Sequence, residues 1–126
     1  EVVGVTFLAR GADTLFAEAV VGAGGRLVVV LPSRDYREAK VKGEHAVAFD
    51  RLAAGAEMVV MPFESAERRA YEAANEELLR RAERLVAVWD GVPAAGKGGT
   101  ADTVARARRV GVPVDVVWPE GAERGE

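Results

Sequence analysis

Short apolar runs alternate along the chain with segments of helical periodicity. The runs are mostly rich in valine and apolar at consecutive positions, and they cover residues 2–8, 27–31, 58–63, 85–89 and 112–118. Runs of this kind are typical of strands that are buried on both faces of a parallel sheet. The pattern therefore predicts five buried strands.

Apolar residues at helical spacing fill most of the segments between the runs. The expected helices cover residues 12–21, 46–56, 67–83 and 100–110, of which the third has the strongest apolar face. Strands that alternate with helices of this length form βαβ units, whose right-handed crossovers put helices on both faces of a sheet. The predicted fold is therefore α/β with a mostly parallel sheet.

The longest connection, residues 32–44, is rich in charged side chains. We expect an exposed loop with a short helix there, and a solvent-facing His45 beside it. The polar residues 120–126 are expected to form a tail outside a single domain of residues 1–119. Because the chain begins with Glu1 rather than Met, we also expect it to be a piece of a longer protein.

Composition excludes several classes of site and partner. The chain has 126 residues, no cysteine and one histidine, which excludes disulfides and thiolate zinc sites and argues against a histidine-built metal site. Its 17 basic and 20 acidic side chains give a net charge of −3, which disfavours a nucleic-acid partner. No apolar run is long enough to span a bilayer, so we expect a cytoplasmic protein without a membrane partner.

The turn after the first apolar run contains candidate binding residues. In an open α/β sheet, ligands bind outside the carboxyl ends of the strands, where helix N-termini point. Gly11 permits a tight turn there, Arg10 can reach an anion at the helix N-terminus, and Asp13 falls in the first helical turn. The alternative interpretation is structural, with Asp13 as a helix cap and Arg10 as a solvated turn residue.

A glycine-rich turn before the last expected helix is the second candidate. Gly98 and Gly99 let the backbone approach a ligand, and the amides that open the helix could hold a phosphate. Lys97 adds a positive charge and Thr100 adds a hydroxyl. The pattern is neither a P-loop nor the dinucleotide-binding fingerprint. The alternative interpretation is a flexible loop followed by a helix that Thr100 caps.

Two further features bear on binding and chemistry. Asn75 lies on the apolar face of the third expected helix, where it either contacts the ligand or bonds to a neighbouring loop. Asp13 and Asp102 both follow strand ends, so they are the candidate catalytic residues, as a carboxylate pair for acid–base chemistry.

These motifs together resemble those of the SLOG superfamily. In chain order they are Arg10-Gly11-Ala12-Asp13 after a strand, Tyr71 and Asn75-Glu76 on a helix, Trp89-Asp90-Gly91 at a strand end, and Gly98-Gly99-Thr100-Ala101-Asp102. The superfamily is Rossmann-like, and it includes the cytokinin-activating phosphoribohydrolases of the LOG family and the DNA-processing protein A family. The chain resembles most closely its small uncharacterised bacterial members.

The resemblance implies a Rossmann-like three-layer sandwich that binds a nucleotide or a nucleotide-derived small molecule. It puts the phosphate at the glycine-rich turn, opposite a wall made by the first turn, and it calls for no cofactor. With Lys97 included, the expected ligand-binding residues are Arg10, Gly11, Asp13, Asn75, Asp90, Lys97, Gly98, Gly99 and Thr100. Relatives commonly dimerise, so we expect a homo-oligomer.

Two departures from the superfamily pattern affect these expectations. The hydrolases carry a glutamate in the helix after their glycine motif, and Thr103 occupies that position here. N-glycosidase activity on a nucleoside monophosphate is therefore the alternative function, with Asp13 or Asp102 as the acid–base group. The opening βα unit of the relatives is missing, so the first and fourth strands are expected either to meet directly or to leave a gap.

A second alternative is an interaction module or a single-strand nucleic-acid-binding module, as in the DNA-processing relatives. The arginine cluster in the last expected helix is the local basic patch that such a role would use, and it comprises Arg106, Arg108 and Arg109. We interpret this cluster as a solvated helix face.

Overall fold

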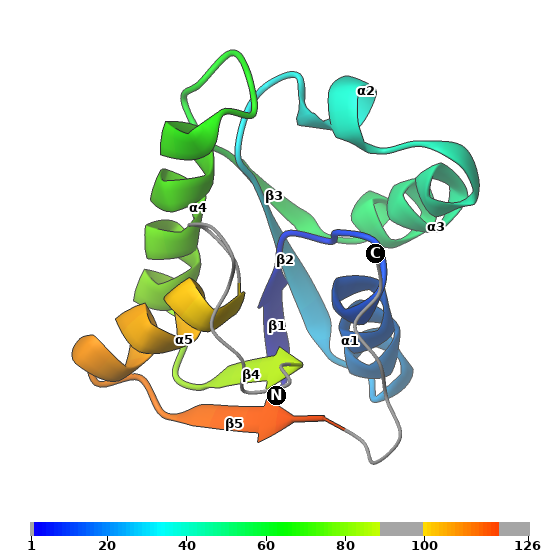
Figure 1. Cartoon of the computed structure of the whole chain (residues 1–126). Coiled ribbons are helices and arrows are strands. Elements are labelled where there is room, and N and C mark those ends of the chain that lie inside the picture. The colour runs from blue at the N-terminus through cyan, green and yellow to red at the C-terminus, as the bar shows by residue number, and fades with distance from the viewer. Residues whose placement is uncertain (1, 89–99, 119–126) are drawn as a thin grey trace. The chain divides into compact units, whose positions relative to one another are not determined.

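The computed structural model describes residues 2–88 and 100–118, which form an α/β fold with parallel strands (Figure 1). The described elements are, in chain order, β1 (Val3–Thr6), α1 (Ala12–Gly22), β2 (Arg26–Leu31), α2 (Tyr36–Lys40), α3 (Gly43–Ala54), β3 (Glu57–Val60), α4 (Arg68–Arg81), β4 (Leu85–Val88), α5 (Thr100–Arg109) and β5 (Val114–Val117). All five expected strands and all four expected helices are present, so the α/β prediction is confirmed. Burial of all five strands is not: β2 is buried, but β3 and β5 are mostly exposed.

The chain divides into two compact units, Glu1–Leu78 and Leu79–Glu126. Helix α4 begins in the first unit and ends in the second. The described strands form two separate sheets, one in each unit, with β1 in the first sheet and β4 in the second. Of the two arrangements expected for the first and fourth strands, direct pairing is therefore not observed.

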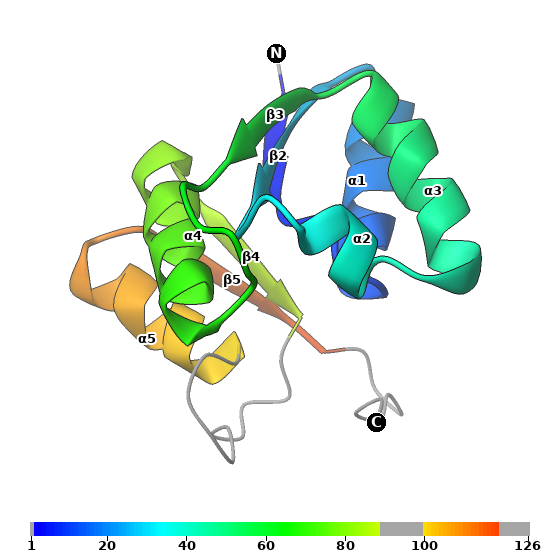
Figure 2. The ribbon, with the colours of Figure 1, turned by 90° about the horizontal axis from the view of Figure 1, so that it is seen from above.

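The first unit contains a three-stranded parallel sheet in the order β1-β2-β3. Strand β2 is central, pairing Val28 with Val5 of β1 and with Glu57 of β3, and its Val29 and Val30 are fully buried. Helix α1 packs on β1, β2 and α3, and both views show α1 and α3 side by side on one face of this sheet (Figures 1 and 2). Two right-handed crossovers that progress in the same direction produce this arrangement.

The second unit contains a two-stranded parallel sheet formed by β4 and β5. Helix α5 packs against both strands through its buried face, which includes Val104 and Ala107. The Leu85 N–H donates to the Pro113 carbonyl at 2.8 Å, just where the two strands begin. This hydrogen bond sets the register of the pair.

Residues 32–44 differ from the expected exposed loop. The short helix is present as α2, but Pro32, Ser33, Tyr36 and Val41 are buried. The ring of Tyr36 and the side chain of Val41 are part of the hydrophobic core of the first unit. The charged residues between them therefore form the outer surface of this segment. The expectation of an exposed connection with a short helix therefore holds for most of its charged residues and was wrong for these four, because burial of the apolar side chains draws them into the core.

Candidate functional site

The turn between β1 and α1 has an uncommon backbone conformation. Leu8 is fully buried and has a φ of 59°, in the left-handed region that non-glycine residues seldom adopt. Gly11, which precedes the first residue of α1, has a φ of 89° that favours glycine. The Thr6 hydroxyl accepts a hydrogen bond from the Leu8 N–H at 3.0 Å. Burial of the Leu8 side chain and the hydrogen bond of its backbone N–H therefore both stabilise this conformation.

Side chains in the first turn of α1 also stabilise the loop between β1 and α1. The Asp13 carboxylate accepts the Ala9 N–H at 3.1 Å, and the Thr14 hydroxyl donates to the Ala9 carbonyl at 2.9 Å. The backbone N–H and the backbone carbonyl of Ala9 are thus both hydrogen-bonded to side chains of α1. Asp13 therefore has a structural role in fixing the turn that carries Arg10 and Gly11, but it does not cap α1, whose first turn has no side-chain cap hydrogen bond.

The surroundings of Asp13 also alter its protonation. It is half-buried, and burial raises its pKa above the ordinary 3.8. Hydrogen bonds from Ala9 and Thr6 and the charge of His45 act in the opposite direction without cancelling the effect of burial. A carboxyl group in this environment takes up a proton more readily than one in water, which suits proton transfer.

Two tyrosines lie in the same region. Tyr36 opens α2 just beyond the carboxyl end of β2, and its ring meets the ring of Tyr71 of α4 edge-on, with centroids 6.5 Å apart. Burial, together with Tyr71 and Asp13, raises the pKa of Tyr36 to about 12. The pKa of Tyr71 is raised as well, by burial and then by Asp35. The two rings are in contact, and the charges of Asp13 and Asp35 act on them, so we refer to Asp13, Asp35, Tyr36 and Tyr71 as the polar cluster.

The segment after β2 is fixed to the segment after β3. Ser33 is fully buried, and its hydroxyl donates to the Asp35 carboxylate at 2.6 Å. The Arg34 N–H donates to the Phe63 carbonyl at 2.8 Å, and the Arg34 side chain is ion-paired with Glu64. The carboxyl ends of β2 and β3 are therefore held together next to the polar cluster.

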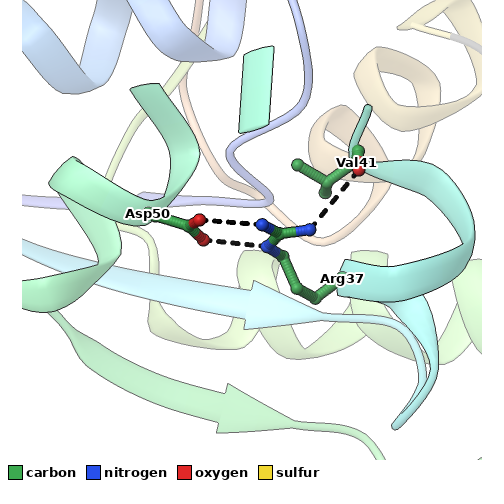
Figure 3. Close-up of polar contacts among 3 residues, drawn as sticks. All are labelled: Arg37, Val41 and Asp50. Carbon is green, nitrogen blue, oxygen red and sulfur yellow. Dashed lines mark hydrogen bonds and ion pairs between the residues drawn. The ribbon is translucent and has the colours of Figure 1, made fainter. Parts of the chain in front are cut away.

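Helices α2 and α3 are joined by a two-pronged contact. Arg37 of α2 donates through Nε and Nη2 to the two carboxylate oxygens of Asp50 of α3, at 2.8 and 2.7 Å (Figure 3). Its remaining nitrogen, Nη1, donates to the Val41 carbonyl at 3.5 Å (Figure 3). The same guanidinium lies 5.9 Å from the centre of the Phe49 ring. Arg37 thus fixes α2, and with it Tyr36, against α3.

His45 is not in the exposed connection where the sequence suggested it. It lies in the first turn of α3, is half-buried, and meets the ring of Phe49 edge-on at 6.1 Å between centroids. The expectation of a solvent-facing side chain was wrong because α3 begins at Gly43, three residues earlier than the predicted helix. The additional turn brings His45 close enough to affect the pKa of Asp13.

The other predicted site residues are distributed over both units. Arg10 is exposed in the turn after β1, and Asn75 is half-buried on α4. Thr100 begins α5 and is exposed, as is Asp102 in the first turn of that helix. The predicted residues Asp90, Lys97, Gly98 and Gly99 lie outside the described residues. The polar cluster therefore combines Asp13 and Tyr71 with two residues that the motifs did not single out, Asp35 and Tyr36.

No family model matches the chain, and no curated protein matches it at a significant level. Within residues 2–88 and 100–118, no three histidine or acidic side chains are grouped so as to hold a metal ion. The helices of that same part of the chain are too short or too polar to traverse a membrane. The polar cluster and the order of the motifs are therefore the features of the chain that bear on its function.

Proposed function

We propose that the chain is a SLOG-like domain that binds a nucleotide or a nucleotide-derived small molecule at the carboxyl ends of its parallel strands. The observation that carries this proposal is the polar cluster in the first unit, which combines Asp13, Asp35, Tyr36 and Tyr71 beyond β1 and β2. In α/β proteins the carboxyl ends of the strands are where ligands bind. The motif resemblance supports the same proposal, because its residues Arg10, Gly11 and Asp13 follow the carboxyl end of β1.

The chemistry of the cluster suits a ligand with hydroxyls and a flat ring. Carboxylate oxygens accept hydrogen bonds, and tyrosine hydroxyls both donate and accept them. The half-buried ring of Tyr71 offers an aromatic surface, on which bases stack with a favourable free energy of about 1–3 kcal/mol. A nucleoside provides both kinds of partner in one molecule.

Isothermal titration calorimetry with AMP and with ADP-ribose tests the proposal. Wild-type protein is expected to bind at least one of them, and Asp13→Asn is expected to weaken that binding by about tenfold or more, because it removes the charged acceptor. Glu18→Gln is the matched control: it removes one carboxylate from the exposed side of the same helix, where Glu18 pairs with Arg51. Absence of binding to wild type, or equal effects of the two variants, would contradict the proposal.

A second candidate function is hydrolysis of the N-glycosidic bond of a nucleoside monophosphate. It is favoured by one observation, the raised pKa of Asp13, since a carboxyl group that keeps its proton can supply it to the departing base. Water would then add to the sugar carbon and release ribose phosphate and the free base. Asp102, the other candidate acid, is an exposed residue in the first turn of α5.

Chromatographic detection of adenine released from AMP decides between binding and hydrolysis. If the chain is an N-glycosidase that uses Asp13, release is lost in Asp13→Asn and kept in Asp102→Asn. The opposite result would assign the acid to Asp102. Binding of AMP without release of adenine would leave binding alone as the function.

A further inference from the structure

Asp13 and Tyr36 come from consecutive βα turns and lie close together. Asp13 follows β1 and Tyr36 follows β2, and the negative charge of Asp13 is one of the causes that raise the pKa of Tyr36. The two strands pair in parallel, so their carboxyl ends are neighbours at one edge of the sheet. The pair therefore stands where a ligand at that edge would meet both side chains.

The Tyr36 hydroxyl is available for a ligand. Although the residue is only 6% exposed, its side-chain contacts within the described part of the chain are made by the ring, against Tyr71 and the core. Among the described residues, no buried side-chain nitrogen or oxygen lacks a hydrogen-bond partner. A Tyr36 hydroxyl without a bond inside the chain must therefore reach the surface.

The two groups complement each other as donor and acceptor. A tyrosine with a pKa of about 12 keeps its proton at neutral pH and donates it. The Asp13 carboxylate accepts the Ala9 N–H through Oδ2 and a hydrogen bond from Thr6, and because a carboxylate has about four acceptor positions it can still accept one from a ligand. An alcohol matches this pair, because a single hydroxyl accepts one hydrogen bond and donates another. A phosphate matches it poorly, because its oxygens only accept and its charge repels the carboxylate.

We infer that Asp13 and Tyr36 bind the ribose hydroxyls of the nucleotide, and that its phosphate lies away from them. This inference rests on the proposed nucleotide-binding function. The first unit would then bind the ribose, which is uncharged. Tyr36, which the sequence motifs do not include, would be a specificity-determining residue.

The test compares a nucleotide with the form of it that lacks the ribose hydroxyls. Binding of AMP and of 2′,3′-dideoxy-AMP is measured by calorimetry on wild type and on Tyr36→Phe, which removes one oxygen and keeps the ring. We expect Tyr36→Phe to weaken AMP about tenfold, the usual effect of one lost hydrogen bond, and to leave dideoxy-AMP unchanged. If ADP-ribose binds and AMP does not, the same comparison uses ADP-ribose and its form without the hydroxyls on the adenosine ribose.

Glu18→Gln is the control, since it changes an exposed side chain that pairs with Arg51 and should leave the preference for AMP over dideoxy-AMP unchanged. An equal loss for both nucleotides in Tyr36→Phe, or no loss for either, would overturn the inference while the proposed function stands. Failure of wild type to bind AMP or ADP-ribose would overturn the proposed function and the inference together. The two failures are thus separate results.

Discussion

Asp13 closes the turn that precedes its own helix: its carboxylate accepts the Ala9 N–H at 3.1 Å, four residues earlier in the chain. Leu8, the residue just before the turn so closed, is in a left-handed conformation, which costs about 1–2 kcal/mol in a residue with a Cβ atom. The hydrogen bond and the burial of Leu8 offset that cost. One side chain thus shapes the turn and also presents a carboxylate at the carboxyl end of β1.

Replacing Asp13 by Asn should change stability in a manner that depends on pH. Burial raises the pKa of Asp13 in the folded state above the ordinary 3.8, so the folded protein binds this proton more tightly than the unfolded chain does. Wild type therefore loses stability as the pH rises from 3.8 through the folded pKa, and Asp13→Asn does not. We expect the variant to gain stability relative to wild type as the pH rises from 3.8 through the raised pKa of Asp13, measured by urea unfolding.

Asp50→Asn is a control of opposite sign. The Arg37 guanidinium lowers the pKa of Asp50, so this carboxylate contributes stability above pH 3.8 that is lost as the pH falls through its lowered pKa. Asp50→Asn should therefore lose stability relative to wild type as the pH rises from below the lowered pKa to 3.8, and the difference should stay constant at higher pH. The same pH trend in both variants would show that burial does not govern the proton affinity of Asp13.

Tyr36 should titrate last of the tyrosines. Its pKa of about 12 exceeds the ordinary 10.0 because of burial, Tyr71 and Asp13. Since the folded state holds the proton more tightly than the unfolded chain, stability falls as the pH rises from 10 toward 12. We expect the ultraviolet absorbance of tyrosinate to show a component near pH 12 in wild type and in Tyr71→Phe. Persistence of that component in Tyr36→Phe would contradict the assignment.

The strands and helices were predictable because their signals are local. A run of consecutive valines such as Leu27–Leu31 has few ways to be buried other than as a central strand, and β2 is that strand. The segment 32–44 was not predictable from its charges, because the burial of Tyr36 and Val41 depends on contacts with the rest of the core. Charge density along the sequence does not reveal which side of a short helix faces inward.

The candidate site was predictable only in part. Asp13 was found because a glycine turn between a strand and a helix is a sequence signal in its own right. Tyr36 was missed, although its position five residues beyond a buried strand places it at the same edge of the sheet. Its relation to Asp13 depends on the pairing of β1 with β2, and a tyrosine among charged residues gives no sign of that neighbour.

Arg37→Lys should weaken the link between α2 and α3. A lysine keeps the charge but cannot donate two parallel hydrogen bonds to the Asp50 carboxylate. Because both side chains are largely exposed, the loss of stability should be small and should decrease with added salt. The control is Arg51→Lys, since Arg51 donates to Glu18 through a single nitrogen. Urea unfolding should show a smaller effect for the control, and equal effects would contradict the importance of the two-pronged geometry.

Two glycines at the end of α1 should respond oppositely to the same substitution. A Cβ atom on Gly25 would lie 2.7 Å from the Val2 carbonyl oxygen and 2.9 Å from Cγ1 of Val20, so the backbone itself would have to move. We expect Gly25→Ala to cost about 1–3 kcal/mol, the usual effect of inserting a methyl group into a packed site.

Gly22, the last residue of α1, has no atom within 4 Å of a Cβ built on it. Gly22→Ala should therefore be neutral or stabilise the helix by up to about 1 kcal/mol, because alanine loses less backbone freedom on folding. Unfolding in urea measures both variants under one condition. Equal destabilisation by the two substitutions would contradict the prediction that the close approach of Gly25 to Val2 excludes a side chain at residue 25.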